Sequence, residues 1–297
     1  MTRFLQSVIA GIGQGSIYAL LALGFVIIYK ATRAVNFAQP GLMILGAYLV
    51  VYLGNIVGLT FWLALPLAML VTALFALAIE RLAIRPMIGK PVFAIAIITI
   101  GIDIMLRISV NDLLGSNVRN VPDPWGLKTF ELGGVVVQQR RVAMLVAAAL
   151  VVTLLLLFFK YSRTGLAMRA AAFDQEAALA QGIRVGTVFA VSWALAGGLA
   201  ALAGMFVGTG GGLDQQTAFV ALKALPGVIL GGIDSIQGAI IGALIVGLFE
   251  GFSNTYQTQY LSFLGENFSQ VVPYAILFIV LLVRPYGLFG TPEIERV

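Results

Sequence analysis

The 297-residue sequence contains no cysteine and no histidine. The lack of cysteine excludes disulfides and thiolate metal sites, and it leaves the redox compartment undefined. The lack of histidine removes the commonest general base and metal ligand, so neither a Ser–His–Asp triad nor an H-E-x-x-H zinc site can be built. We therefore expect no catalytic residue, no metal site and no bound cofactor, and we do not expect an enzyme.

A phosphate-binding loop is also missing from the sequence. The pattern G-x-x-x-x-G-K-[ST] does not occur, and the dipeptide Gly89-Lys90 is followed by Pro91. The chain therefore cannot cradle nucleotide phosphates with a P-loop. If it moves a solute against a gradient with energy from ATP, that energy has to enter through another protein.

Charged residues are scarce as well. They make up 10% of the chain, against about 25% in an ordinary globular domain, while 60% of the residues are hydrophobic and the mean hydropathy is +1.00. Apolar runs such as 142–159 do not alternate with polar residues, which excludes a membrane β-barrel. The composition predicts an all-α polytopic membrane protein.

The apolar runs predict about eight transmembrane helices within a single transmembrane domain of residues 1–297. Each run is long enough to cross a hydrocarbon core about 30 Å thick. Segment 218–233 is shorter and is interrupted by Pro226 and three glycines, which predicts a broken or re-entrant helix. Segment 4–29 has no A-x-A cleavage site, so we expect a retained first span. The predicted spans are 4–29, 41–58, 61–80, 92–114, 141–159, 187–208, 236–253 and 269–283.

The lysines and arginines of the loops predict the orientation. The positive-inside rule places these loops in the cytoplasm, with the amino terminus outside and the carboxyl terminus inside, provided that segment 218–233 in effect crosses the membrane. The net charge of +5 then reflects cytoplasmic loops and not nucleic-acid binding. Loop 115–140 would lie outside although it carries cations that two acids offset only in part. The cations are Arg119, Lys128 and Arg140, with Arg141 directly after them, and the acids are Asp123 and Glu131. The lysines and arginines that place their loops in the cytoplasm are Lys30, Arg33, Arg81, Arg85, Lys90, Lys160, Arg163, Arg169, Arg184, Arg284 and Arg296.

Few ionisable residues fall inside the predicted spans. Asp103 precedes Arg107 by one helical turn, so the two can pair locally. Glu250 stands near a span end, from which it could reach the interface, and Lys223 lies in the broken segment. Because ion-coupled carriers place such residues at mid-membrane, this small set disfavours a secondary transporter.

Glycines four apart in the spans indicate close helix packing.

The segment 169–183, RAAAFDQEAALAQGI, is a polar, helix-forming exception in an apolar chain. Asp174 is predicted as a helix N-cap, and Glu176 would lie near the positive end of the helix dipole. Gly182 can adopt the left-handed conformation that ends a helix. An alternative is an amphipathic helix lying on the bilayer, but lysine and arginine are too few for anionic headgroups. A short cytoplasmic helix is therefore expected here.

Five motifs in order give a resemblance to a known family. The stretch EAALAQG fits the Glu-Ala-Ala-x-x-x-Gly signature of the membrane subunits of bacterial ABC importers, which docks into the ATP-hydrolysing subunit. Over nearly its whole length the chain resembles the LivH-type permeases of the branched-chain amino acid importer family. The motifs are NFAQPGLMILGAY (36–48), TIG (99–101), TGLAMRAAAFDQEAALAQGI (164–183), KALPGVILGGIDSIQGAIIG (223–242) and RPYGLFG (284–290).

The resemblance implies the fold of an ABC importer permease in a bacterial inner membrane and a set of partners. These are a paralogous second permease, two cytoplasmic ATP-binding subunits and an extracytoplasmic solute-binding protein. Segment 165–183 would be the coupling segment, moved by the ATPases during alternating access. The solute would be a branched-chain or related amino acid, with urea or a short-chain amide as the alternative; a passive channel or an ion-coupled carrier is the alternative class. The implied ATPase-coupling residues are Arg169, Asp174, Glu176, Ala177, Ala178 and Gly182.

A solute pathway is expected where polar side chains or broken backbone reach membrane depth. Asn36 and Gln39 precede a predicted span, and Pro226, Gly231 and Gly232 interrupt the broken segment. Packing alone is an equally good explanation of the glycines. Two departures from the family pattern bear on solute preference: Pro40 and Gly41 stand where relatives often have Gly-Glu, and Asp234 stands where a small residue is usual.

Overall fold

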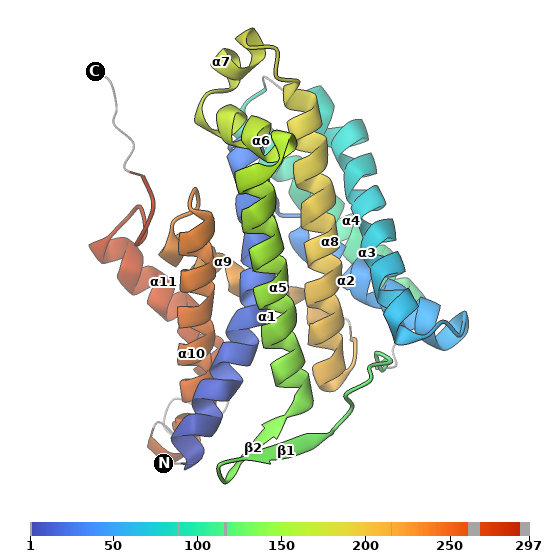
Figure 1. The fold of residues 1–297 in the computed structure, drawn as a ribbon, viewed down its shortest axis with the longest axis vertical. Coiled ribbons are helices and arrows are strands. Elements are labelled where there is room, and N and C mark those ends of the chain that lie inside the picture. Colours follow the sequence, from blue (N-terminus) through green and yellow to red (C-terminus); the bar gives the residue numbers. More distant parts are fainter. Residues whose placement is uncertain (1, 88–89, 116–117, 215, 261–267, 292–297) are drawn as a thin grey trace. The chain divides into compact units, whose positions relative to one another are not determined.

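The computed structural model describes residues 2–87, 90–115, 118–214, 216–260 and 268–291, most of them helical. Figure 1 shows the course of the chain. The helices are α1 (Thr2–Thr32), α2 (Gln39–Val51), α3 (Phe61–Ile79), α4 (Val92–Leu114), α5 (Gln139–Tyr161), α6 (Arg163–Phe173), α7 (Gln175–Ala180), α8 (Val185–Gly211), α9 (Ala224–Gly231), α10 (Ile236–Tyr260) and α11 (Val272–Val283). The strands are β1 (Thr129–Leu132) and β2 (Val135–Gln138).

Within the described ranges, seven helical segments are long and apolar enough to cross a membrane. They coincide with the first seven predicted spans, and the all-α polytopic fold class is confirmed. The eighth prediction, 269–283, differs: a 3-10 turn at Phe268–Gln270 precedes α11, which has only 12 residues. At 1.5 Å per residue such a helix is about 18 Å long and does not cross a 30 Å core alone.

The broken segment is also present as predicted. A 3-10 helix, Thr217–Lys223, passes directly into the eight-residue α9. Gly232 ends α9 with a φ of +103°, a conformation that L side chains rarely adopt. The segment is therefore a short helix with an irregular entry and a sharp exit.

The chain forms two compact units, and the division falls inside α1 and α5, which are continuous helices. The first unit comprises residues 1–22, 125–149 and 223–297, and the second comprises 23–124 and 150–222. The expectation of one transmembrane domain over residues 1–297 stays a prediction.

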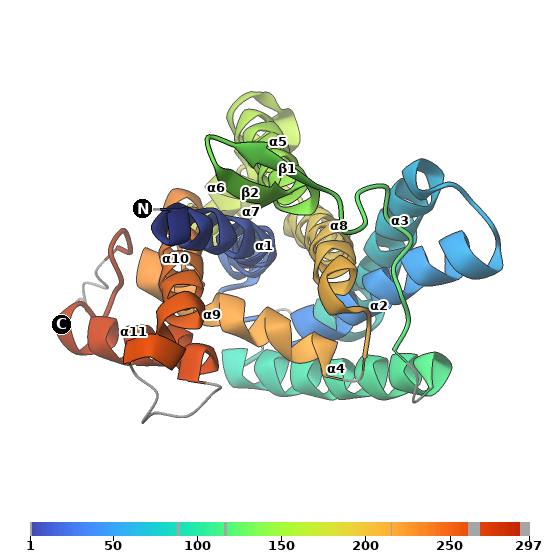
Figure 2. The ribbon, with the colours of Figure 1, turned by 90° about the horizontal axis from the view of Figure 1, so that it is seen from below.

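The first unit is held together by glycines on helices in backbone contact. A Cβ placed on Gly247 of α10 would lie 2.3 Å from the Cα of Gly15 of α1, and one on Gly242 would lie 2.1 Å from the carbonyl oxygen of Gly227. Such distances leave no room for a side chain, so the glycines spaced by four serve helix packing. Figure 2 shows α9, α10 and α11 side by side in this unit.

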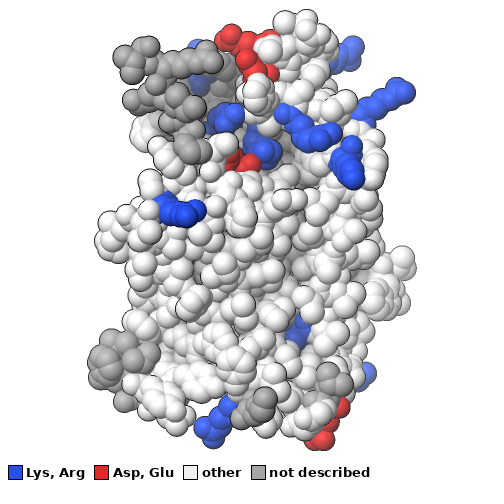
Figure 3. Space-filling model, turned by 60° about the vertical axis from the view of Figure 1, so that its left-hand side comes forward, with Lys and Arg blue, Asp and Glu red and all other residues white. Residues whose placement is uncertain are grey.

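The second unit is built around α8, which packs against α2 and α3. Trp193 of α8 is fully buried, and a Cβ on Gly46 of α2 would lie 2.3 Å from the Cα of Ala201. The outer faces of α3 and α4 instead expose large apolar side chains, among them Trp62 and Phe93. On the face drawn in Figure 3, most of the surface belongs to uncharged residues, as expected for helices in contact with lipid.

Candidate functional site

The coupling segment predicted at 165–183 is a pair of short helices, α6 and α7, between the end of α5 and the start of α8 (Figure 1). Ser162 begins α6 because its hydroxyl oxygen accepts a hydrogen bond of 2.8 Å from the amide of Gly165. A Cβ on Gly165 would lie 2.4 Å from the carbonyl oxygen of Phe158, so α6 folds back closely against the end of α5. The segment is thus fixed to a membrane-spanning helix without a flexible linker.

The end of α6 and the start of α7 meet at Asp174, whose predicted role as N-cap is confirmed. Its Oδ1 accepts hydrogen bonds of 2.9 Å from the amides of Glu176 and Ala177. The left-handed conformation predicted for Gly182 is confirmed by its φ of +81°. The amide of Gly182 donates to the carbonyl of Leu179, which closes the helix end.

The exposed surface of this segment contains most of the predicted coupling residues. Arg169, Asp174, Glu176, Ala177 and Gly182 are exposed. Ala178 is only 4% exposed, so its side chain packs on the protein itself and only Ala177 of this pair presents its methyl group outward. Phe173, which no sequence pattern pointed to, is 90% exposed at the turn between the two helices.

Two hydrogen bonds tie the coupling segment to the end of α1. The guanidinium of Arg33 donates to the carbonyl oxygen of Ala172 over 2.5 Å, and the amide nitrogen of Gln175 donates to the carbonyl oxygen of Ala31 over 2.8 Å. The two bonds lie on either side of the Asp174 turn. Neither contact was predicted, because the partners are 139 and 144 positions apart.

A second set of hydrogen bonds connects the end of α3 to the start of α8. Arg85 donates two hydrogen bonds of 3.0 Å to the fully buried carboxylate of Glu80, and a third of 2.9 Å to the carbonyl oxygen of Gly186. Two-point contact fixes the guanidinium more firmly than a single ion pair does. The helix that follows the coupling segment is therefore also held at its first turn.

The pathway candidates Asn36 and Gln39 are buried in the second unit. The Oδ1 of Asn36 accepts from the amide of Ala38, and the Nε2 of Gln39 donates to the carbonyl oxygen of Ala196. Gly24 of α1 makes room for the Gln39 amide, since a Cβ there would lie 2.2 Å from its Nε2. These polar groups position the start of α2, and their assignment to a pathway stays a prediction.

A carboxylate of α4 lies at the start of α2. The Oδ1 of Asp103 accepts a hydrogen bond of 2.7 Å from the amide of Gly41, and its Oδ2 accepts one of 2.8 Å from Arg107. The predicted local pairing of Asp103 with Arg107 is confirmed. A carboxylate from α4 thus binds the first turn of α2.

The other pathway candidates, Pro226, Gly231 and Gly232, are buried in the first unit. A Cβ on Gly231 would lie 2.0 Å from the carbonyl oxygen of Gly238, and one on Gly232 would lie 2.4 Å from the amide nitrogen of Gly290. The two glycines therefore allow close packing, and a role in the pathway stays a prediction. Asp234, which follows this element, accepts a hydrogen bond from the hydroxyl of Thr291.

Glu250, for which the sequence suggested a position near the membrane interface, is buried in the protein. It is 5% exposed, and its Oε1 accepts a hydrogen bond of 2.9 Å from Lys223 while its Oε2 accepts one of 2.5 Å from the hydroxyl of Tyr18. Glu250 itself lies in α10, and its two partners come from the turn before α9 and from α1, all in the first unit. Because they are 27 and 232 positions away, only the fold brings them to Glu250.

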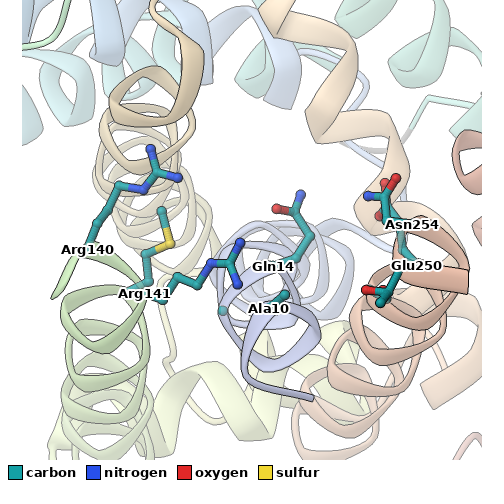
Figure 4. A pocket seen from close by; sticks show the side chains of 10 residues that line it. Ala10, Gln14, Arg140, Arg141, Glu250 and Asn254 are labelled. Carbon is teal, nitrogen blue, oxygen red and sulfur yellow. The ribbon is translucent and has the colours of Figure 1, made fainter. Parts of the chain in front are cut away.

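A polar cavity of about 300 Å³ opens in the same unit, between the first part of α1, the start of α5 and α10 (Figure 4). Arg140 and Arg141 line one wall, Glu250 and Asn254 line the opposite wall, and Gln14 lies between them. In the sequence, the two arginines pointed only to topology. The signal that could have found them was a pair of cations at the end of a span that the positive-inside rule places outside.

The structure combines helices of membrane-spanning length with a capped helical pair outside these helices and a polar cavity among them. These are features of a transport permease. The family model for the permease component of the branched-chain amino acid transport system matches residues 7–281. The chain therefore belongs to the branched-chain amino acid transport permease family. This confirms the resemblance given by the five motifs.

Individual relatives agree with this membership. The chain is 32% identical to the high-affinity branched-chain amino acid transport system permease protein LivH of Salmonella typhimurium, over 99% of this chain and 98% of the relative. It is also 32% identical to the permease protein BraD of Pseudomonas aeruginosa, with the same coverage. A probable LivH of Methanocaldococcus jannaschii is 29% identical over 93% of this chain and 89% of the relative. The chain is thus a multi-pass membrane protein of a transport system.

Proposed function

We propose that this chain is the membrane permease subunit of an ATP-driven importer that moves branched-chain or related amino acids across the inner membrane. Separate ATPase subunits power it, and the chain itself hydrolyses nothing. The observation that carries the proposal is the coupling segment: a capped, largely exposed helical pair that is hydrogen-bonded to the end of α1. A segment of this kind can receive a displacement outside the membrane and pass it to the helices within it.

The mechanism is alternating access driven by closure of the ATPases. A push on α7 is carried by Gln175 and Arg33 to the end of α1, and directly along the chain to α5 and α8. Arg169, Asp174 and Glu176 offer polar contacts to an ATPase. Ala177 allows the ATPase to approach closely, and Gly182 ends the second helix of the coupling segment. Ala178 contributes by packing the coupling segment against the rest of the permease.

The remaining partners and the orientation follow from the family and from the loop charges. A paralogous permease completes the pathway, two cytoplasmic ATP-binding subunits bind the coupling segments, and an extracytoplasmic solute-binding protein delivers the solute. The amino terminus lies outside and the coupling segment lies in the cytoplasm. The pathway residues remain those proposed from the sequence, Asn36, Gln39, Pro226, Gly231 and Gly232.

The solute class rests on the relatives, whose names specify branched-chain amino acids. Urea or a short amide carried by the same class of importer is the alternative solute. An ion-coupled carrier is less well supported, because the carboxylates of Asp103 and Glu250 are each paired with a neighbouring cation. A carboxylate held in this way is poorly placed to take up and release a coupling ion.

Reconstitution tests the proposal. The chain is purified with its partner permease and ATPases, placed in proteoliposomes with the solute-binding protein, and supplied with radiolabelled L-leucine. Uptake is expected to require ATP and to continue when proton and sodium gradients are collapsed by ionophores. Accumulation by this chain alone, driven by an ion gradient, would refute the proposal, whereas ATP-driven uptake of urea but not L-leucine would change only the solute.

A further inference from the structure

An apolar groove of about 310 Å³ lies in the second unit, between α3, the later part of α5 and α8. One residue of α3 and four residues each of α5 and α8 line it, and none of their side chains is charged or hydrogen-bonding. Leu154 is 56% exposed, whereas Leu155 and Leu199 are buried. The groove is therefore open on one side to the surroundings of these helices, which in a membrane are lipid.

Two neighbouring glycines of α8 show that the groove is a gap in helix packing. A Cβ on Gly197 would lie 2.7 Å from the Cβ of Ala76, so α8 meets α3 closely there. A Cβ on Gly198 would meet nothing nearer than the carbonyl oxygen of Met69, at 4.0 Å. A void would forfeit the contacts of its lining, so hydrocarbon is expected to fill this space in the membrane.

The dimensions of the groove favour an acyl chain over a helix. Along α5 the groove runs from Val151 to Phe158, which at 1.5 Å per residue is about 10 Å. Half of the hydrocarbon core is about 15 Å thick, so this length suits part of one acyl chain. A helix about 10–12 Å wide would occupy on the order of 1,000 Å³ over the same length, about three times the volume of the groove.

Cations follow at the end of the groove that is nearest to the coupling segment. Phe158 lines the groove, and Lys160 stands two residues later in the last turn of α5. Arg163 begins α6, whose first turn contains no acidic residue. Both cations are exposed, and within the described ranges neither forms an ion pair. This charge is complementary to an anionic headgroup above the groove.

An aromatic ring stands between the groove and the second cation. Tyr161, the last residue of α5, is 72% exposed, and the ammonium nitrogen of Lys160 lies 5.1 Å from the centre of its ring. Tyrosine is enriched at the level of the lipid headgroups, and lysine side chains at helix ends reach towards the same level. The apolar groove, the ring and the cations therefore follow along the chain in the order of the parts of a phospholipid.

We infer that this groove binds an anionic phospholipid, with one acyl chain between α3, α5 and α8 and the phosphate at Lys160 and Arg163. Each cation near an anionic headgroup corresponds to about a fivefold gain in binding. Ser162 caps α6 between the two cations, so the bound lipid stands at the base of the coupling segment. The inference does not depend on ATP hydrolysis or on the identity of the solute.

Native mass spectrometry of the full chain tests the inference, because it resolves individual bound lipids. The probes are phosphatidylglycerol, which is anionic, and phosphatidylcholine, which has no net charge. We expect the native chain to bind its first phosphatidylglycerol at least about fivefold more tightly than its first phosphatidylcholine. The double variant K160Q/R163Q should lose about 25-fold in affinity for phosphatidylglycerol, since two contacts of about fivefold each are removed. K90Q, which removes an exposed lysine between α3 and α4, is the matched control and should bind as the native chain does.

A second variant tests the groove without changing a charge. G198L fills the gap from α8 at a position where a side chain has room, so the melting temperature should not fall. Binding of both lipids is expected to weaken. G101L is its control, because a Cβ on Gly101 of α4 also meets no atom within 4 Å among the described residues, and it should leave lipid binding unchanged.

Three outcomes would overturn the inference. The first is equal affinity of the native chain for the two lipids, and the second is unchanged phosphatidylglycerol binding in both K160Q/R163Q and G198L. The third is displacement of phosphatidylglycerol by an equal concentration of sn-glycerol 3-phosphate, which has the phosphate without acyl chains and would indicate a site for a free anion. If G198L releases the partner permease and leaves lipid binding intact, the groove is a contact between permeases and the inference also fails.

Discussion

The guanidinium of Arg33 and the carbonyl oxygen of Ala172 are joined by a hydrogen bond of 2.5 Å. Arg33 has a φ of +57°, in the left-handed region, where a non-glycine residue costs roughly 1–2 kcal/mol. The chain keeps an arginine where glycine would be less strained. The hydrogen bond to the coupling segment gives a physical reason for that choice.

Arg33→Gly should therefore separate coupling from stability. Glycine relieves the left-handed conformation by about 1 kcal/mol and removes a hydrogen bond worth about the same, so the melting temperature should change little. ATP-driven uptake should fall about fivefold, the factor that corresponds to ~1 kcal/mol. Arg33→Lys retains a cationic donor and should keep part of the uptake. Full uptake by Arg33→Gly would show that this bond transmits nothing.

A buried glycine contact predicts a loss of stability on the smallest possible substitution. Gly247→Ala places a Cβ 2.3 Å from the Cα of Gly15, a contact that forces α1 and α10 apart. Overpacking of this kind typically costs about 1–3 kcal/mol, which thermal unfolding in detergent should detect as a lower melting temperature.

Gly101→Ala is the matched control for Gly247→Ala. Gly101 also lies inside a helix, but a Cβ there meets no atom within 4 Å among the described residues. Alanine favours a helix over glycine by up to about 1 kcal/mol, so Gly101→Ala should be neutral or stabilising. Equal melting temperatures for the two variants would contradict the close packing of α1 and α10.

The ion pair of half-buried Lys223 with buried Glu250 predicts non-additive stability. Removing one partner leaves the other charge buried without compensation, at a cost of about 3–5 kcal/mol, whereas removing both is often close to neutral. Lys223→Met and Glu250→Gln should each lower the melting temperature clearly. The double variant should be more stable than either single one.

A double-mutant cycle in detergent or nanodiscs measures this coupling directly. Additive losses from the two substitutions would mean that the 2.9 Å contact between Lys223 and Glu250 contributes nothing to stability. The cycle also tests how the broken helix is held in place, because Lys223 is the N-cap residue of α9.

The sequence predicted the features that depend only on residues close to one another in the chain. The cap at Asp174, the helix end at Gly182 and the ion pair of Asp103 with Arg107 all join residues within one helical turn or at its end. The hairpin of β1 and β2 also had a local signal that was not used. Gly133 and Gly134 separate two short strands, and their φ angles of +57° and +79° are those of the tight turn that favours such a pair.

What the sequence could not predict depends on distant partners. Nothing near Arg33 shows that its side chain reaches Ala172, and nothing near Glu250 shows that Lys223 pairs with its carboxylate and Tyr18 donates to it. The shortness of α11 could not be predicted for another reason. The apolar run 269–283 shows only that the segment is hydrophobic, whereas Pro273 and the turn before it determine where the helix begins. The cavity beside Arg141 likewise exists only once three helices have packed.

Labelling of a single cysteine tests most directly whether the coupling segment receives the ATPase. Because the native chain has no cysteine, Ala177→Cys introduces a unique thiol at an exposed position. Leu127→Cys, at a side chain that is 93% exposed in the loop predicted to lie outside, is the control. Each variant is treated with a membrane-impermeant maleimide in right-side-out and inside-out vesicles, with and without the ATPase subunits.

We expect Cys at 177 to be labelled only in inside-out vesicles and to be protected when the ATPases are bound. Cys at 127 should be labelled only in right-side-out vesicles and never be protected. Labelling of position 177 from the outer side, or equal labelling with and without the ATPases, would show that this segment does not receive the ATPase in the cytoplasm.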